Sequence, residues 1–151
     1  FIGTPLWIAK ACNKIQGQVT SATCAIAQKA TERAMLAEPR SATQKMKETF
    51  LNRRDMLIDL LNEIPGIKCN IPKGAFYVFP DISYYFGKSN GETKINNAND
   101  LCMYLLYNAN VAFVAGDAFG NSDCIRISYA ASDDKLIEAM KRIKIHLSKL
   151  V

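Results

Sequence analysis

The sequence predicts an α/β fold in which a small sheet packs against helices. Residues 75–79 and 124–129 are rich in β-branched and aromatic side chains and are bounded by turn residues, which is typical of strands. Residues 41–64 show an amphipathic pattern, and residues 136–150 carry a regular apolar stripe, so both are expected to be helices. Helices come first and strands mixed with helices follow, which favours a compact α/β layer with the long helix as its spine.

Two shorter helices are expected ahead of the long one. The first begins with a Thr-Pro pair at residues 4–5, where Thr caps the helix and Pro occupies the first helical position. It is expected to end near Gly17, because glycine is common at helix ends. The second helix is expected to be capped by residues 20–21 and to stop at Pro39.

The long helix is expected to follow a domain boundary. Residues 39–40 interrupt the helical pattern and mark that boundary, which assigns the first 38 residues to a different domain. Ser41 and Gln44 then match a capping box, in which each side chain bonds the backbone of the other residue. The Pro-Gly pair at residues 65–66 is expected to end the helix.

The C-terminal part is expected to alternate strands with helices. Short strands are predicted at residues 67–69 and 111–114, in addition to the two main ones. Asn97 is the expected cap of a helix that runs to Ala109 with one apolar face. Ser132 and the acidic residues after it are expected to begin the last helix, because negative charge suits the N-terminal end of the helix dipole.

Composition bears on the class of protein. The chain has 151 residues and 49% hydrophobic content, enough for one core, and it begins with Phe1, which predicts a part of a longer protein. No apolar run is long enough to cross a membrane, so no membrane partner is expected.

The five cysteines show no C-x-x-C pattern, which predicts reduced thiols and a cytoplasmic location. The single His146 leaves no residue cluster for a metal site or a Ser-His-Asp triad.

The positive charge raises an alternative function. A net charge of +5 and a pI near 9.0 are compatible with a basic binding module that has no catalytic role and binds nucleic acid or an acidic partner. Lysine and arginine are, however, interleaved with glutamate and aspartate, and no aromatic-rich basic stripe accompanies them. Solvated helix faces explain the charge better, so no nucleic-acid partner is expected.

Arg126 is the candidate binding residue. Strand alternation places it on the face opposite to Ile125 and Ile127, with the short side chains of Cys124 and Ser128 beside it. A guanidinium with room beside it can bind a carboxylate through two parallel hydrogen bonds. The alternative from spacing alone is an ordinary solvent-facing arginine, because most charged residues are exposed.

Other segments near Arg126 also have two interpretations. Residues 116–120 carry two glycines around an aromatic residue, so this loop can approach a ligand closely, or it can be a plain strand connection. The aromatic pair at residues 76–77 is more often part of a core than a ligand contact.

Three segments in one order, residues 72–83, 111–120 and 125–130, resemble class I aminotransferases of the aspartate aminotransferase family. Residues 3–28 are similar to the part of that family that follows its cofactor lysine. Residues 85–88 and 100–101 resemble the prokaryotic aspartate branch in particular. The resemblance therefore covers nearly the complete chain.

The resemblance implies a fold and a division into parts. The fold would be the small C-terminal domain of a fold type I aminotransferase, with a small mixed or antiparallel sheet packed with helices. Residues 1–38 would be the C-terminal remnant of the large cofactor-binding domain, residues 39–64 the interdomain long helix, and residues 65–151 the small domain. By motif match, Arg126 would bind the α-carboxylate of the substrate. The family usually has Pro-Gly where this chain has Ala-Gly at residues 115–116, which can loosen the loop.

The resemblance also implies an activity that this chain supports only in part. The full enzyme would use pyridoxal 5'-phosphate to transfer an amino group from L-aspartate, or a similar amino acid, to 2-oxoglutarate, and would be a homodimer. The cofactor lysine would lie upstream of Phe1, so we expect no catalytic, cofactor-binding or metal-binding residue in this chain, no cofactor bound to it and no activity from it alone. An interaction domain whose exposed apolar surface, around the first two helices, covers a missing domain or subunit is compatible with this interpretation.

Overall fold

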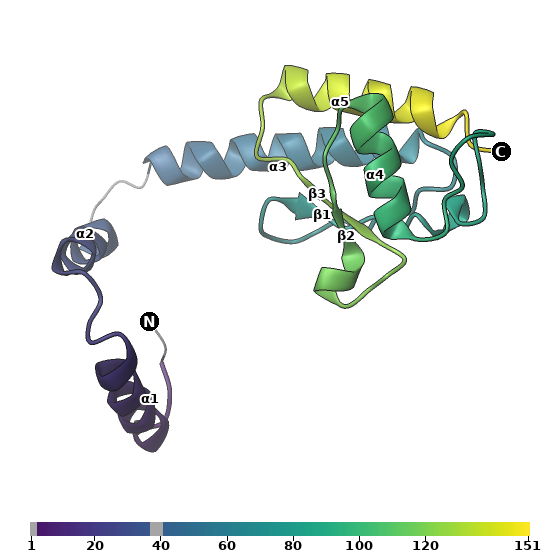
Figure 1. Ribbon diagram of the computed structural model, residues 1–151. Helices are drawn as coiled ribbons and strands as arrows, with labels where there is room; N and C mark the ends of the chain where they lie inside the picture. The colour runs from purple at the N-terminus through teal and green to yellow at the C-terminus, as the bar shows by residue number, and fades with distance from the viewer. Residues whose placement is uncertain (1–2, 37–40) are drawn as a thin grey trace. The chain divides into compact units, whose positions relative to one another are not determined.

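The computed structural model describes residues 3–36 and 41–151. The chain forms two compact units, Phe1–Ser41 and Ala42–Val151, and the boundary predicted at residues 39–40 lies outside the described residues. The elements are drawn in Figure 1: α1 (Leu6–Val19), α2 (Ala25–Leu36), α3 (Ser41–Asn62), β1 (Tyr77–Val78), η1 (Ser83–Tyr85), α4 (Ala98–Ala109), β2 (Val114–Ala115), η2 (Gly116–Phe119), β3 (Ile125–Ser128) and α5 (Asp133–Leu147).

The first unit contains α1 and α2. Pro5 lies directly before α1, so the helix starts one residue later than predicted. It also continues past Gly17 and ends at Val19. Thr20 ends α1, because its N–H donates to the carbonyl oxygen of Gln16 at 3.0 Å. The prediction that residues 20–21 cap the second helix was therefore wrong, since α2 begins only at Ala25.

Both helices of the first unit expose apolar side chains. Neither α1 nor α2 contains a buried residue. Most of their large apolar side chains are exposed, namely Leu6, Trp7, Ile15, Val19, Ile26, Met35 and Leu36. Within the described residues of the first unit, nothing covers these apolar surfaces.

The long helix α3 carries part of the core of the second unit. Leu57 and Leu61, four residues apart on one face, are completely buried. Ser41 is the first helical residue, and Gln44 donates a hydrogen bond of 2.8 Å to the carboxylate of Glu48. The side chain of Gln44 thus pairs along the helix and not back toward Ser41, contrary to the predicted capping box.

A three-stranded antiparallel sheet forms the other layer of this unit, in the order β1-β3-β2. Its strands are shorter than predicted, because β1 covers only Tyr77–Val78 of residues 75–79 and β3 only Ile125–Ser128 of residues 124–129. The strand predicted at residues 67–69 is reduced to one bridge between Lys68 and Asp81. The strand predicted at residues 111–114 is displaced to Val114–Ala115.

Helices α4 and α5 follow the predictions closely. The side chain of Asn97 accepts a hydrogen bond of 2.9 Å from the N–H of Asp100 and caps α4 as expected. Residues of the predicted apolar stripe of α5 are buried, namely Leu136, Met140, Ile143, Leu147 and Leu150. Helices α3 and α5 lie side by side (Figure 1). Arg53 of α3 pairs with Asp133 of α5 at 2.6 Å, and Glu63, directly after α3, pairs with Lys144 of α5 at 2.7 Å.

The core lies between these helices and one face of the sheet. Val78, Ile125, Ile127 and Tyr129 point into it together with the buried residues of the helices. The predicted α/β class with a small antiparallel sheet is confirmed. The opposite face of β3, which carries Arg126, is left for other contacts.

Candidate functional site

Arg126 lies on the central strand of the sheet, between β1 and β2. Val114 is directly opposite Arg126, and Tyr77 is directly opposite Ser128. Opposed residues of antiparallel strands share a face, and residues two apart on one strand do so as well. Tyr77, Val114 and Arg126 are therefore on the same face of the sheet, away from the core. Arg126 is half-buried there.

Two aromatic rings hold the guanidinium of Arg126. Its Cζ atom lies 4.5 Å from the centroid of the Tyr77 ring and 4.2 Å from the centroid of the Phe119 ring. Both distances are within the range in which an aromatic face attracts a cation. These ring contacts also fix the direction of a long side chain that would otherwise sample many rotamers.

The guanidinium keeps its hydrogen-bond donors free. Within residues 3–36 and 41–151, no carboxylate forms an ion pair with Arg126 and no acceptor receives a hydrogen bond from its side chain. The other three arginines of the second unit, Arg53, Arg54 and Arg142, each form an ion pair with a carboxylate. Arg126 is thus the arginine of this set that remains ready to bind an incoming planar anion.

The loop of residues 116–120 supplies one of the two rings. It forms the short helix η2, which ends at Gly120 in the left-handed conformation that glycine favours, with φ of 83°. The Phe119 ring packs edge-on against Phe79, with ring centroids 6.2 Å apart. The loop is therefore more than a strand connection, because it places an aromatic ring over Arg126.

The other ring is positioned through β1. The Phe76 ring lies against that of Tyr77, with centroids 4.4 Å apart. The hydroxyl of Tyr129 donates a hydrogen bond to the carbonyl oxygen of Ala75 at 3.1 Å. The backbone N–H of Tyr129 donates a hydrogen bond to the carbonyl oxygen of Phe76 at 3.0 Å. These bonds join the start of β1 to the end of β3, so the position of Tyr77 relative to Arg126 is fixed by the backbone.

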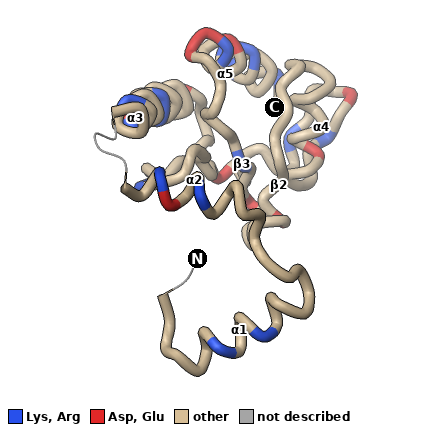
Figure 2. Tube along the Cα trace, turned by 90° about the vertical axis from the view of Figure 1, so that its left-hand side faces the viewer, with Lys and Arg blue, Asp and Glu red and all other residues tan. Residues whose placement is uncertain are grey.

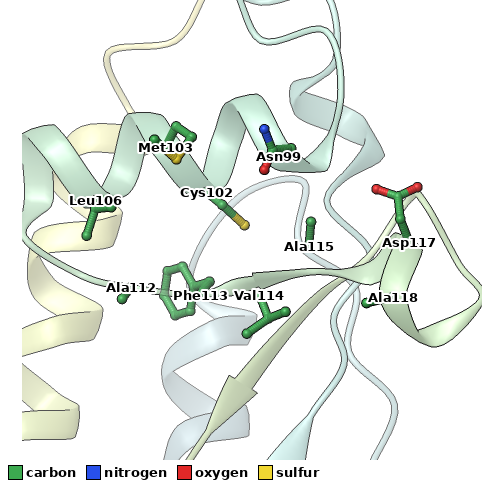
Figure 3. Close-up of a pocket in the computed structure, with 10 residues that line it drawn as sticks. All are labelled: Asn99, Cys102, Met103, Leu106, Ala112, Phe113, Val114, Ala115, Asp117 and Ala118. Carbon is green, nitrogen blue, oxygen red and sulfur yellow. The ribbon is translucent and has the colours of Figure 1, made fainter.

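An apolar groove of the second unit lies away from Arg126. It has a volume of about 440 Å³ and lies between α4 and the segment of residues 112–118 (Figure 3). Its wall is mainly apolar, and Cys102 and Leu106 point from α4 toward that segment. Burial raises the pKa of the Cys102 thiol to about 11, so this thiol is protonated at neutral pH and is no nucleophile. The groove does not include Arg126 or either of its rings.

The comparisons with known proteins show which family the chain belongs to. The family model described as aminotransferase class I and II matches residues 1–143. The chain belongs to the class I and II aminotransferase family. A bifunctional aspartate aminotransferase and glutamate/aspartate-prephenate aminotransferase of Petunia hybrida is 46% identical over 147 residues, which are 95% of this chain and 31% of that protein. An aspartate aminotransferase of Rhizobium meliloti is 40% identical over 151 residues, which are 99% of this chain and 37% of that protein.

Solved aminotransferase structures share the fold of this chain. The crystal structure of the aspartate aminotransferase from Rhizobium meliloti has a TM-score of 0.90 at 39% identity, over 99% of this chain and 37% of that one. The aromatic aminotransferase from Pyrococcus horikoshii has a TM-score of 0.83 at 32% identity, over 97% of this chain and 37% of that one. The predicted aminotransferase fold is confirmed, and the chain spans about a third of the length of these relatives.

The lysines of α1 and α2 do not fit a Schiff-base site for an aldehyde cofactor. A Schiff base to an aldehyde cofactor needs a desolvated, positioned lysine. Lys10 and Lys14 on α1 and Lys29 on α2 are exposed, and Lys29 pairs with Glu32 at 2.8 Å. Among the described residues there is also no group of His, Cys, Asp and Glu that could hold a metal ion.

The charges of the chain are spread over its helices. Figure 2 shows basic and acidic residues interspersed along α2 and α5. Among residues 3–36 and 41–151, five ion pairs neutralise part of the positive charge, including Arg142–Glu138 at 2.8 Å. This distribution is that of solvated helix faces and gives no support to a nucleic-acid interface. In the part of the chain that the structure describes, no helix has the length and apolar character needed to span a membrane.

Sequence reasoning identified Arg126 but missed its two ring partners. The aromatic pair Phe76 and Tyr77 was interpreted as more typical of a core than of a ligand contact, although the side chain of Tyr77 is on the face of Arg126. Phe119 was noted only as part of a glycine-bearing loop. A sequence signal did exist, because an aromatic residue between two glycines just before the Arg126 strand is well placed to reach that strand.

Proposed function

We propose that this chain is the C-terminal part of a pyridoxal-phosphate-dependent aspartate aminotransferase, in which Arg126 binds the α-carboxylate of the substrate. The observation that carries the proposal is the guanidinium of Arg126, which two aromatic rings hold while no described residue accepts a hydrogen bond from it. A carboxylate matches those donors through two parallel charge-assisted hydrogen bonds. Every amino acid and 2-oxo acid substrate carries such a carboxylate.

The names of the relatives support the amino donor. We assign L-aspartate, or a similar amino acid, as the donor, since relatives at 40–46% identity are named aspartate aminotransferases or aspartate-prephenate aminotransferases. The acceptor in this proposal is 2-oxoglutarate, which the resemblance to the family implies. The five cysteines are free, which supports a cytoplasmic location.

The domain assignment rests on exposed apolar surface. In this proposal residues 1–38 belong to a large cofactor-binding domain, residues 39–64 form the interdomain helix and residues 65–151 form the small domain. The uncovered apolar side chains of α1 and α2, such as Trp7 and Ile26, are suited to packing against the rest of that large domain and a second subunit of a homodimer.

The cofactor belongs to another part of the enzyme in this proposal. Pyridoxal phosphate, when bound, receives and returns the amino group, and the residues that hold it would lie upstream of Phe1. The chain alone is then expected to be inactive. Its contribution is to orient the substrate, because a carboxylate fixed on Arg126 restricts how the α-carbon can face the reacting groups.

The test replaces Arg126 in the complete enzyme. Arg126→Ala should lower kcat/KM for L-aspartate about 100-fold or more, because two charge-assisted hydrogen bonds are lost. Arg126→Lys should recover only part of the rate, because an ammonium cannot bind both oxygens in the planar fork geometry. The control is Arg142→Ala on α5, an arginine that pairs with Glu138 at the surface. Equal kinetics of the Arg126→Ala and Arg142→Ala enzymes would refute the role of Arg126.

A further inference from the structure

In the part of the chain that the structure describes, neutral rings and not hydrogen-bonding groups hold the guanidinium of Arg126. Tyr77 comes from β1 and Phe119 from η2, so segments on both sides of β3 contribute one ring each. A carboxylate or carbonyl partner would also fix an arginine, but it would use the N–H donors that the substrate needs. An aromatic face attracts the positive charge through its quadrupole and leaves those donors free.

We propose that Phe119 and Tyr77 are positioning residues. They orient the guanidinium of Arg126, which in turn binds the carboxylate of the substrate. This inference rests on the proposed function of Arg126 and adds to it the residues that pre-organise the guanidinium. Restricting the side chain before the substrate arrives removes part of the entropy cost of binding. The rings thus raise affinity for the part of the substrate that all amino donors share.

Contacts behind the rings support a built arrangement. Phe79 contacts the edge of the Phe119 ring at a centroid distance of 6.2 Å, with the ring planes at 86°. Phe76 contacts Tyr77 on the other side of the site at 4.4 Å. Each ring over Arg126 therefore has an aromatic neighbour that restricts its own motion.

Phe119 is the better residue to replace first. Its side chain is 45% exposed, so a substitution there leaves the core of the unit intact. Phe119→Leu keeps an apolar side chain of similar bulk but removes the aromatic face. Phe119→Tyr keeps the face. Comparison of the two separates attraction of the cation from simple packing against the stem of the arginine.

The experiment uses the full-length holoenzyme and two readouts. The first is the Kd of succinate, a dicarboxylate without an amino group, measured by calorimetry. The second is kcat/KM for L-aspartate and for a second amino donor. Phe119→Leu should weaken succinate binding about 2- to 30-fold, the range of a cation–π contact, and Tyr77→Leu should do the same. Phe119→Tyr should bind as the wild type does.

Two comparisons distinguish positioning from a general structural effect. Positioning of the α-carboxylate clamp predicts an equal loss of kcat/KM for both amino donors, since the carboxylate is common to them. Tyr107→Leu is the matched control, because this aromatic side chain is 74% exposed on α4 and does not contact Arg126. It should change neither readout.

The outcomes that overturn the inference are specific. If Arg126→Ala loses succinate binding while Phe119→Leu and Tyr77→Leu bind as the wild type does, the rings have no positioning role and the proposed function stands. If Phe119→Tyr loses as much as Phe119→Leu, shape and not the aromatic face is responsible. If Arg126→Ala itself binds succinate normally, the proposed function fails and this inference fails with it.

Discussion

The backbone N–H of Gly116 donates a hydrogen bond of 2.8 Å to the carbonyl oxygen of Cys124. This bond closes the loop that leaves β2 and enters β3, and Phe119 lies within that loop. A Cβ atom on Gly116 would be 2.1 Å from the carbonyl oxygen of Asn121 and 2.5 Å from that of Cys124, which is closer than Cβ atoms are found. A side chain at this position must therefore displace the backbone that carries Phe119.

Gly116→Ala is expected to destabilise the second unit by about 1–3 kcal/mol, the usual cost of overpacking. Urea unfolding followed by far-ultraviolet circular dichroism measures this, since the single tryptophan, Trp7, lies on α1 in the other unit. Gly74→Ala is the control, because no atom lies within 4 Å of a Cβ at that glycine. Equal unfolding midpoints for the two variants would show that the loop yields without cost.

Leu61 tests the packing of α3 against the sheet. Its side chain is completely buried, so Leu61→Ala should lower the free energy of unfolding by about 2–5 kcal/mol through lost burial and a residual cavity. Leu51→Ala on the same helix is the matched control, because Leu51 is 43% exposed and should cost much less. A loss at Leu61 no greater than that at Leu51 would contradict the assigned core.

The helices of the second unit could be predicted because their signals are local. Asn97 caps α4 through the N–H of a residue only three positions away, and the stripe of α5 depends on spacing alone. Strand limits depend on distant partners and were predicted less well. Val111 still donates its N–H to Leu105 at the end of α4, so pairing of this segment begins only at Val114, opposite Arg126.

The same distinction applies to the site. Alternation along one strand was enough to place Arg126 away from the core, because it needs no knowledge of neighbouring strands. Its ring partners depend on the register of β1 against β3 and on the fold of η2. Neither can be read from local sequence, so Tyr77 and Phe119 became visible only in the structure.

Tyr85 should make stability depend on pH in the alkaline range. Its buried hydroxyl donates a hydrogen bond of 2.5 Å to the carbonyl oxygen of Pro65, just after α3. Burial raises the pKa of Tyr85 from 10.0 to about 12. In the unfolded chain this hydroxyl ionises near its ordinary pKa, while in the folded chain it stays protonated to higher pH. The stabilisation is therefore complete below the unfolded pKa and is lost as the pH rises through the folded value.

Tyr85→Phe removes both the hydrogen bond and the titrating group. At neutral pH it should cost about 0.5–1.5 kcal/mol, plus the penalty of leaving the carbonyl oxygen of Pro65 without this donor. Between about pH 10 and about pH 12 its free energy of unfolding should fall less steeply than that of the wild type, so the difference between the two proteins narrows. Tyr107→Phe, at an exposed tyrosine of α4, should follow the wild-type curve throughout. Parallel curves for wild type and Tyr85→Phe would mean that the Tyr85 hydroxyl ionises equally readily in both states, and that the buried hydrogen bond to Pro65 does not hold its proton.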